Sequence, residues 1–289
     1  MPDSEKDEEA GVPEPEAIEA EGPISTRAEL AQVEERLAIG ANVVYETIRR
    51  EGDDELSRSP QALAWSGFAA GLSIGFSLVA EALLQAHLPD RPWRPLISRL
   101  GYCLGFLIVI LGRQQLFTEN TLTVILPLLV RRNRKTLLAV LRLWGIVLLT
   151  NLLGTAVFGL VLARTNVLAP GLRVVLLSLG LKYLNLPLGT MLWRSVFAGW
   201  LVALMVWLLP AAASSRVWII VIITYVIGLA GFSHVIAGST TLFYLVFVGA
   251  EPWSGLFTAF LLPVLAGNLM GGVALVAALA HGQVVGGGS

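Results

Sequence analysis

Two apolar stretches of this chain are each interrupted by a short polar sequence: RQQLFTEN at residues 113–120 and GFSHVIAGS at residues 231–239. Backbone polar groups at membrane depth must be satisfied by protein or by a water-filled cavity, so such interruptions are costly elsewhere. Paired interruptions in corresponding halves of a chain are typical of the substrate pathways of transporters. The two breaks therefore predict a membrane permeation protein whose working centre lies at the breaks.

The composition excludes an ordinary soluble domain. Of the 289 residues, 55% are hydrophobic and 14% are charged, whereas a soluble domain carries about 25% charged residues. Residues 1–60 hold 17 of the 21 acidic residues, and the rest of the chain holds 14 basic residues but only 4 acidic ones. Basic cytoplasmic loops and attraction of anions explain this excess equally well.

Six segments have the length and hydropathy of spanning helices, because about 20 apolar residues cross a bilayer. They lie near residues 62–86, 96–130, 137–163, 186–212, 217–248 and 253–280. The basic loop RRNRK at residues 131–135 is expected to face the cytoplasm. With six spans, this orientation puts both termini in the cytoplasm.

The remaining segments divide the chain into four regions. Residues 1–25 are acidic and rich in proline, with Pro13, Pro15 and Pro23 among them, which predicts a disordered tail. Residues 26–58 carry apolar residues at helical spacing and predict a cytoplasmic amphipathic helix, at the membrane surface or against the bundle. The channel domain is expected over residues 60–282, and residues 283–289 are interpreted as a tail or linker.

An internal repeat relates the two halves. The sequence TNLLGT at residues 150–155 resembles GNLMGG at residues 267–272, and the same offset carries Glu119 onto Ile236. Three spans per half is an odd number, so the halves must be inverted, as in many transport folds. We therefore expect an all-α membrane protein with six transmembrane helices in two inverted three-helix repeats, aquaporin-like, with helices 2 and 5 broken. Asn151 and Asn268 occupy equivalent positions and are interpreted as structural residues that bond the broken helices.

His234 is the leading candidate for the substrate pathway. A histidine at membrane depth is a functional candidate, and small changes in its surroundings decide whether the ring is charged. We interpret it as a group that gives a proton to a passing anion or pairs with it, with a structural histidine as the alternative. Thr118 is expected to donate a hydrogen bond to the anion, or else to satisfy freed carbonyls. Asn120 is expected to tie the backbone of the break.

Glu119 has three interpretations. An ionised carboxylate in an anion pathway repels the substrate, so pairing with nearby Arg113 is the favoured one. Approach to His234, where the carboxylate would favour the imidazolium form, is the second. The third is that the protein does not carry simple anions at all. Arg194, close to the membrane, is expected to be structural and to pair with carbonyls or a carboxylate.

Bulky apolar residues near the polar centre are candidates for constrictions that lose water and exclude ions. Phe117 and Phe232 flank the centre, and Leu116 and Leu204 are weaker candidates; ordinary packing is the alternative for all four. The three histidines are scattered, and no nucleotide-binding loop or nucleophile motif is present. We therefore expect no metal, no cofactor, no nucleic-acid partner and no enzymatic activity.

Four ordered motifs together resemble the formate/nitrite transporter family. LFTENT at residues 116–121 resembles the loop in its second helix, and RSVFAGWLVALMVW at 194–207 resembles its fourth helix. GFSHVIA at 231–237 and LPVLAGNLMGG at 262–272 resemble its broken fifth helix and its sixth helix. The resemblance covers residues 60–282 and points to the family's YfdC-like branch.

The resemblance implies a homopentamer in the bacterial inner membrane, with one pore per protomer, that carries small monovalent weak-acid anions such as formate or nitrite. Its partners would be the anion or its neutral acid, membrane lipids and copies of itself. Lys182 resembles a vestibule lysine that draws anions in, with an ordinary loop lysine as the alternative. Gly199 and Gly238 stand where the family has asparagines near the histidine, and Glu119 stands where many members have a small residue.

The favoured hypothesis is a passive or proton-coupled channel in which the anion is neutralised before an apolar constriction, because a bare ion in a low-dielectric slot is strongly disfavoured. A channel for water or small neutral solutes, closed by a pair between Glu119 and His234, is the alternative class. A non-conducting scaffold or sensor that works through the acidic tail is a third.

Overall fold

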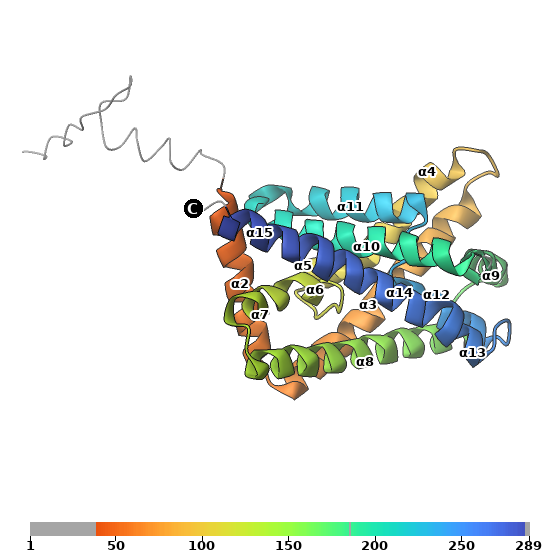
Figure 1. The fold of residues 1–289 in the computed structure, drawn as a ribbon. Coiled ribbons are helices and arrows are strands. Elements are labelled where there is room, and N and C mark those ends of the chain that lie inside the picture. The colour runs from red at the N-terminus through yellow and green to blue at the C-terminus, as the bar shows by residue number, and fades with distance from the viewer. Residues whose placement is uncertain (1–38, 185, 287–289) are drawn as a thin grey trace, which may run out of the picture. The chain divides into compact units, whose positions relative to one another are not determined.

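The computed structural model describes residues 39–184 and 186–286. The tail expected at residues 1–25, and residues 26–38 of the expected amphipathic helix, lie outside the described residues. Throughout the described part the regular secondary structure is helical. Figure 1 shows the long helices α10 and α11 running side by side in the bundle.

The helices follow one another with short connections. In chain order they are α2 (Ala41–Ser57), α3 (Pro60–His87), α4 (Arg94–Ser98), η1 (Arg99–Tyr102), α5 (Cys103–Leu111), α6 (Asn120–Thr123), α7 (Ile125–Arg131), α8 (Arg134–Arg164), α9 (Pro170–Leu184), α10 (Leu188–Leu208), η2 (Leu209–Ala211), η3 (Ala213–Ser215), α11 (Arg216–Ala230), α12 (Val235–Phe247), α13 (Trp253–Gly255), η4 (Leu256–Leu261), α14 (Leu262–Leu269), η5 (Met270–Ala277) and α15 (Ala278–Gly286).

Among the described residues, five helical segments are long and apolar enough to cross a membrane: Pro60–His87, Arg94–Leu111, Arg134–Arg164, Leu188–Ala211 and Trp253–Val284. The pair α11 and α12, bent by 49°, makes a sixth if it is counted as one span. The chain is therefore an all-helical, multi-pass membrane protein. The helix α9 was not predicted, because its 15 residues are too few for the span that we searched for.

Side-chain caps fix where two of the long helices begin. Ser59 accepts a hydrogen bond from the Ala62 amide at 3.3 Å, and Pro60 occupies the first helical position of α3. Asn133 accepts from the Thr136 amide at 2.9 Å at the start of α8. Both caps satisfy an amide that has no partner within its own helix, so each span begins at a defined residue.

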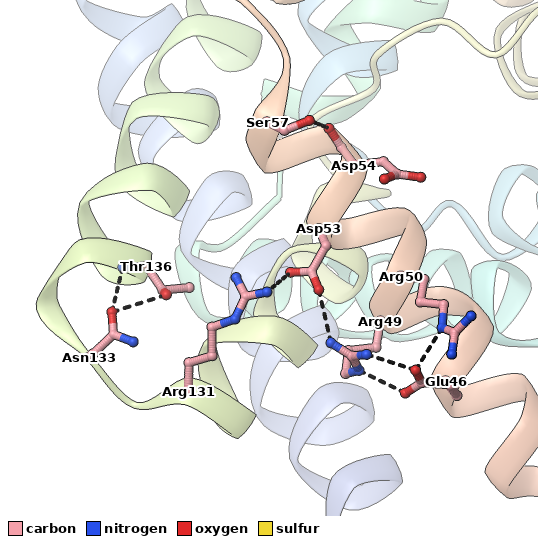
Figure 2. A network of polar contacts seen from close by, with 9 residues as sticks. All are labelled: Glu46, Arg49, Arg50, Asp53, Asp54, Ser57, Arg131, Asn133 and Thr136. Carbon is pink, nitrogen blue, oxygen red and sulfur yellow. Dashed lines mark hydrogen bonds and ion pairs between the residues drawn. The ribbon is translucent and has the colours of Figure 1, made fainter.

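The helix α2 packs one face against the membrane bundle. Its buried residues recur about one turn apart and include Val44, Ile48 and Leu56. An ion-pair network covers its other side, shown in Figure 2. Asp53 lies 2.9 Å from Arg49 and 2.8 Å from Arg131 at the end of α7, the second contact being an ion pair without hydrogen-bond geometry.

The same network keeps Glu46 of α2 ionised. The hydrogen bonds from Arg49 and Arg50 lower the pKa of Glu46 to about 2. These exposed pairs contribute little to stability individually. Their consequence is positional, because the pair between Asp53 and Arg131 ties α2 to the end of α7, next to the basic loop.

In each half of the chain, a glycine lets two neighbouring helices approach closely, and the two contacts are alike. A β-carbon built at Gly71 of α3 would overlap the carbonyl oxygen of Asn151 in α8. A β-carbon built at Gly199 of α10 would overlap the carbonyl oxygen of Asn268 in α14. Small residues allow this kind of backbone approach between membrane helices. Gly199 is therefore the counterpart of Gly71 in the other half.

We expect Gly199→Ala to lower stability by about 1–3 kcal/mol, because the added methyl group must push α10 away from α14. Gly145→Ala is the matched control, since a β-carbon at Gly145 of α8 meets nothing within 4 Å. The measurement is the thermal unfolding of both variants in detergent. Equal midpoints for the two variants would contradict the close approach.

Candidate functional site

Asn151 bonds the backbone of the first break. After α5 ends at Leu111, the chain turns at Arg113, whose φ of 49° lies in the left-handed region. The Phe117 amide donates to Asn151 Oδ1 at 2.9 Å. Asn151 Nδ2 donates to the carbonyls of Gly67 and Gln115, both at 2.8 Å. One buried amide thus satisfies two polar groups of the break and joins them to α3.

Asn268 does the same at the second break. Its Oδ1 accepts from the Val235 amide at 2.8 Å, and its Nδ2 donates to the carbonyls of Ser195 and Ser233 at 2.8 and 2.9 Å. The matching bonds pair Phe117 with Val235, an offset of 118 residues. The predicted equivalence of Glu119 and Ile236 is therefore off by one residue, because the breaks and the asparagines do not share one offset.

The two breaks meet at a contact between Thr118 and His234. His234 Nε2 lies 2.7 Å from Thr118 Oγ1, and each residue is 1% exposed. His234 also begins α12, where its Nδ1 accepts from the Ala237 amide at 3.1 Å. The rings of Phe106 and His234 pack edge to face, with their centroids 5.0 Å apart. The imidazole is thus held from three sides.

These bonds assign the ring hydrogen. Because Nδ1 of His234 accepts the Ala237 amide, a neutral ring carries its hydrogen on Nε2. Nε2 then donates to Thr118 Oγ1. The hydroxyl hydrogen of Thr118 is left to donate elsewhere, and no acceptor for it occurs among residues 39–184 and 186–286.

Two cavities approach this contact from different sides. The first, which we name the Lys182 cavity, has a volume of about 110 Å³. Its lining includes Gly231 and Ala237, which precede and follow His234 by three residues in the sequence. The second, the Glu119 cavity, has a volume of about 440 Å³. Its lining includes Gln115 and Glu119, which precede and follow Thr118 in the sequence. Neither His234 nor Thr118 lines either cavity.

The Lys182 cavity carries an excess of positive charge. Its charged lining residues are Glu81, Arg99, Lys182 and Arg194. Glu81 and Arg99 form an ion pair of 2.5 Å, which neutralises both. Lys182 and Arg194 make no ion pair with the described residues, and Arg194 makes no hydrogen bond to a carbonyl there, so neither of the partners predicted for Arg194 is found in this part of the chain. The ion pair between Glu81 and Arg99 was not predicted from the sequence, although a carboxylate inside an apolar span is a recognisable signal of a functional or paired residue.

The Glu119 cavity holds more acidic than basic groups. Its charged lining residues are Glu51, Asp54, Glu55, Arg58, Arg113, Glu119 and Arg216. Glu119 forms no ion pair with Arg113 or with His234 in the described residues, so both predicted pairings are wrong. Arg113 lies at a left-handed turn and is exposed, whereas Glu119 is half-buried.

The other predicted residues are mostly packed. Asn120 Nδ2 donates to Gln115 Oε1 at 2.9 Å and to the Leu116 carbonyl at 3.3 Å, as expected of a residue that ties the break. Phe117 packs against Trp144 and Phe232 stacks on Phe197, with centroids 5.9 and 5.3 Å apart. Leu116 is fully buried and Leu204 is half-buried in the core.

The positions of the two absent asparagines are filled by other parts of the chain. Gly199 faces the backbone of Asn268, as described above. A β-carbon at Gly238 would overlap the ring of Phe260, which is fully buried. Side chains larger than hydrogen do not fit at either position in this packing, so the two glycines belong to the framework around the site.

The comparisons with known proteins agree with this architecture. The family model described as "Formate/nitrite transporter" matches residues 42–282. The chain belongs to the formate/nitrite transporter family. It is 38% identical over 268 residues to "Inner membrane protein YfdC" of Escherichia coli K12, covering 92% of this chain and 86% of that one. It is 28% identical over 235 residues to "Probable formate transporter" of Methanothermobacter thermautotrophicus, covering 73% and 85%.

Solved structures of this family share the fold. The structure named "FNT family ion channel" matches with a TM-score of 0.72 at 19% identity, over 81% of this chain and 96% of that one. "Pentameric formate channel with formate bound" matches with a TM-score of 0.63 at 19% identity, over 80% and 96%. The family consists of channels and transporters rather than enzymes, so this chain is a membrane transport protein.

We expect Asn151→Asp and Asn268→Asp to destabilise the protein by similar amounts, about 2–5 kcal/mol each. Each change removes two buried donated hydrogen bonds and sets a carboxylate against carbonyl oxygens. Asn166→Asp is the matched control, because this exposed asparagine only accepts, from Arg173 at 2.8 Å. Thermal unfolding in detergent measures all three variants. Loss of stability at only one of the two buried asparagines would show that the halves are not held in the same way.

Proposed function

We propose that this protein is a channel or transporter for small monovalent weak-acid anions such as formate or nitrite, with a central histidine and coupling to protons. In this proposal it forms a homopentamer in the inner membrane, with six spans in two inverted repeats and one pathway in each protomer. The channel domain comprises residues 60–282, and a tail and a cytoplasmic helix precede it.

The contact between Thr118 and His234 is the observation that carries the proposal. It joins the two breaks, it is buried, and a cavity reaches the neighbouring residues on each side. Polar groups placed so deep in an apolar bundle are candidates for a permeation pathway. The ring of Phe106, packed against His234, and the buried Leu116 in the same break favour a solute without net charge at this point.

The hydrogen-bond arrangement suggests how the pair acts. With Nε2–H of His234 donating to Thr118, the threonine hydroxyl is available to donate to an arriving anion. Before the ring can give a proton away, it must take one up at Nδ1, which breaks its bond with the Ala237 amide. Release of the helix α12 cap and proton supply are therefore linked in the proposed cycle.

Charge in the Lys182 cavity suggests where anions are collected. With Glu81 and Arg99 paired, Lys182 and Arg194 leave the cavity positive. A positive cleft with low-dielectric walls raises the local concentration of anions. We assign Lys182 the role of attracting the anion, and the nearby Arg194 the role of supporting it.

The ends of the described chain support an orientation with both termini in the cytoplasm. Tyr45 of α2 bonds His281 of α15 at 2.7 Å, and Asp53 of α2 pairs with Arg131 beside the basic loop. The helices near both termini and the loop at 131–135 therefore share one end of the bundle (Figure 1). Basic loops face the cytoplasm in inner-membrane proteins, which gives the orientation.

We expect His234→Ala to lower formate uptake into proteoliposomes by about tenfold or more, because the pathway loses its proton donor and the bond that orients the Thr118 hydroxyl, whose hydrogen bond to a charged substrate is worth about 1.5–3 kcal/mol. Uptake by the unmodified protein should increase as the pH on the uptake side falls. His87→Ala is the matched control, since His87 is exposed and bonds only the Leu83 carbonyl of its own helix. Full uptake by His234→Ala, with its pH dependence kept, would exclude the role of the histidine.

We expect Lys182→Gln to raise the KM for formate by about threefold, and added salt to shrink this difference, because the attraction is screened. Lys135→Gln removes the same charge from the loop at residues 131–135 and is the control. Initial rates of uptake at low and high salt give both values. A KM that is unchanged in Lys182→Gln at low salt would leave the lysine as an ordinary surface residue.

A further inference from the structure

Two arginines at the start of α8 have side chains that the fold does not use. Arg132 and Arg134 flank the residue that caps α8, and both are exposed. Arg134 makes no hydrogen bond or ion pair to the described residues. Arg132 bonds the Leu129 carbonyl through Nε at 2.9 Å, and its Nη groups have no partner in the same part of the chain. The neighbouring Arg131 is engaged, since Figure 2 shows it turned toward Asp53, 2.8 Å away.

Both free arginines stand where local helix chemistry disfavours them. Arg132 follows α7 in the left-handed region, with a φ of 47°, where glycine or asparagine is the usual residue. Arg134 lies in the first turn of α8, next to the positive end of the helix dipole, which favours an anion and disfavours a cation. Residues that break local rules without a gain in packing are candidates for function. Arg132 and Arg134 together with this helix end therefore favour a negatively charged ligand.

An exposed apolar stripe runs along α8 from the position of Arg134. Its members recur three or four positions apart and so share one helix face: Leu138, Leu141, Gly145, Leu149 and Leu153. The opposite face of α8 packs in the bundle. From residue 138 to residue 153 the stripe is about 22 Å long, more than the roughly 15 Å of hydrocarbon in one leaflet. A β-carbon built at Gly145 meets nothing within 4 Å, so the stripe has an open notch at its middle.

We propose that Arg132, Arg134 and this stripe bind one anionic phospholipid from the membrane leaflet nearest the loop at residues 131–135. The lipid phosphate accepts hydrogen bonds from the two guanidinium groups, and one acyl chain lies along the stripe. The Cα atoms of the two arginines are at most about 7 Å apart, since two residues of chain span no more, so both side chains can reach one phosphate group. Arginine suits this role because its planar group donates to two phosphate oxygens at once.

The combination of charge and apolar surface favours a lipid over the other possible occupants. A soluble anion would use the arginines but leave the stripe unused. A second copy of this chain could cover the stripe, but it would also have to supply acidic partners for both arginines. An anionic phospholipid satisfies both parts at once, because its charged group lies at the membrane surface and its chains lie in the hydrocarbon.

The bound lipid would act on the corner where three helices meet. The pair between Asp53 and Arg131 ties α2 to the end of α7, and Arg142 of α8 donates to the Leu56 carbonyl of α2 at 2.7 Å. A lipid held at the start of α8 stabilises this corner by mass action, because the site is lost when the helices unfold. The inference goes beyond the proposed function and does not depend on which solute crosses the membrane.

Thermal unfolding in a neutral detergent tests the site, with added phosphatidylglycerol or phosphatidylcholine of the same acyl chains. Phosphatidylglycerol should raise the unfolding midpoint more than phosphatidylcholine does. The double variant Arg132→Asn/Arg134→Gln should raise the phosphatidylglycerol concentration at half-maximal shift by about tenfold or more, because two cations near the phosphate are lost. Asparagine is chosen at position 132 because it tolerates the left-handed region. Equal shifts by the two lipids, or an unchanged concentration in the double variant, would overturn the site.

Lys135→Gln is the matched control within the same loop. Lys135 is exposed, but it lies one position further around the helix than Arg134, away from the stripe. At about 0.15 M salt its diffuse attraction is screened, so the concentration at half-maximal shift should change by about twofold or less. An effect of Lys135→Gln as large as that of the double variant would mean unspecific attraction and overturn the site. Without lipid, Arg134→Gln should unfold at the same or a slightly higher temperature, because the removed cation opposes the helix dipole.

Two further measurements distinguish a lipid from other occupants. Glycerol 3-phosphate carries a phosphate group without chains and should not shift the midpoint at the same concentrations. A shift as large as that of phosphatidylglycerol would indicate a site for a soluble anion and overturn the lipid. Leu141→Ala/Leu149→Ala shortens the stripe and keeps both arginines, and it should weaken the phosphatidylglycerol effect about threefold. A smaller assembly of this variant on size-exclusion chromatography, with the lipid effect kept, would assign the stripe to a second copy and overturn the proposal.

Discussion

The structure depends on satisfying the backbone groups left unpaired where the helical pattern stops between α5 and α6 and between α11 and α12. Asn151 and Asn268 do this with the same three hydrogen bonds in each half, two to the break and one to a neighbouring helix. The asparagines reach the breaks because Gly71 and Gly199 bring their helices into backbone contact. Each break is thereby held in one conformation, and Thr118 and His234 meet as a consequence.

Much of this framework was readable from the sequence, because its requirements are local or repeated. Polar residues inside apolar stretches marked the breaks, and the repeated asparagine motif marked the residues that hold them. The surroundings of Glu119 were not readable. Glu119 follows Arg113 by six positions, about the spacing of two helical turns, but the chain between them is not a helix and contains a left-handed turn at Arg113.

Other features depend on distant parts of the chain, which explains why the sequence alone misled. Gly199 and Gly238 looked like lost pathway residues when compared with the family pattern. In the structure, the backbone at Asn268 and the ring of Phe260 occupy the adjacent space, so both glycines serve packing.

The repeated framework also separates what is symmetric in this protein from what is not. With the offset of 118 residues that the hydrogen bonds define, Glu119 corresponds to Ala237, and each of these two residues lines its own cavity. The same position in the repeat thus presents a carboxylate on one side of the central pair and a methyl group on the other. Because the backbone around both is held by equivalent asparagines, this difference changes the chemistry of a cavity without changing the fold. Selectivity can therefore vary at positions 119 and 237, while Asn151, Asn268 and their partner glycines are constrained by the breaks themselves.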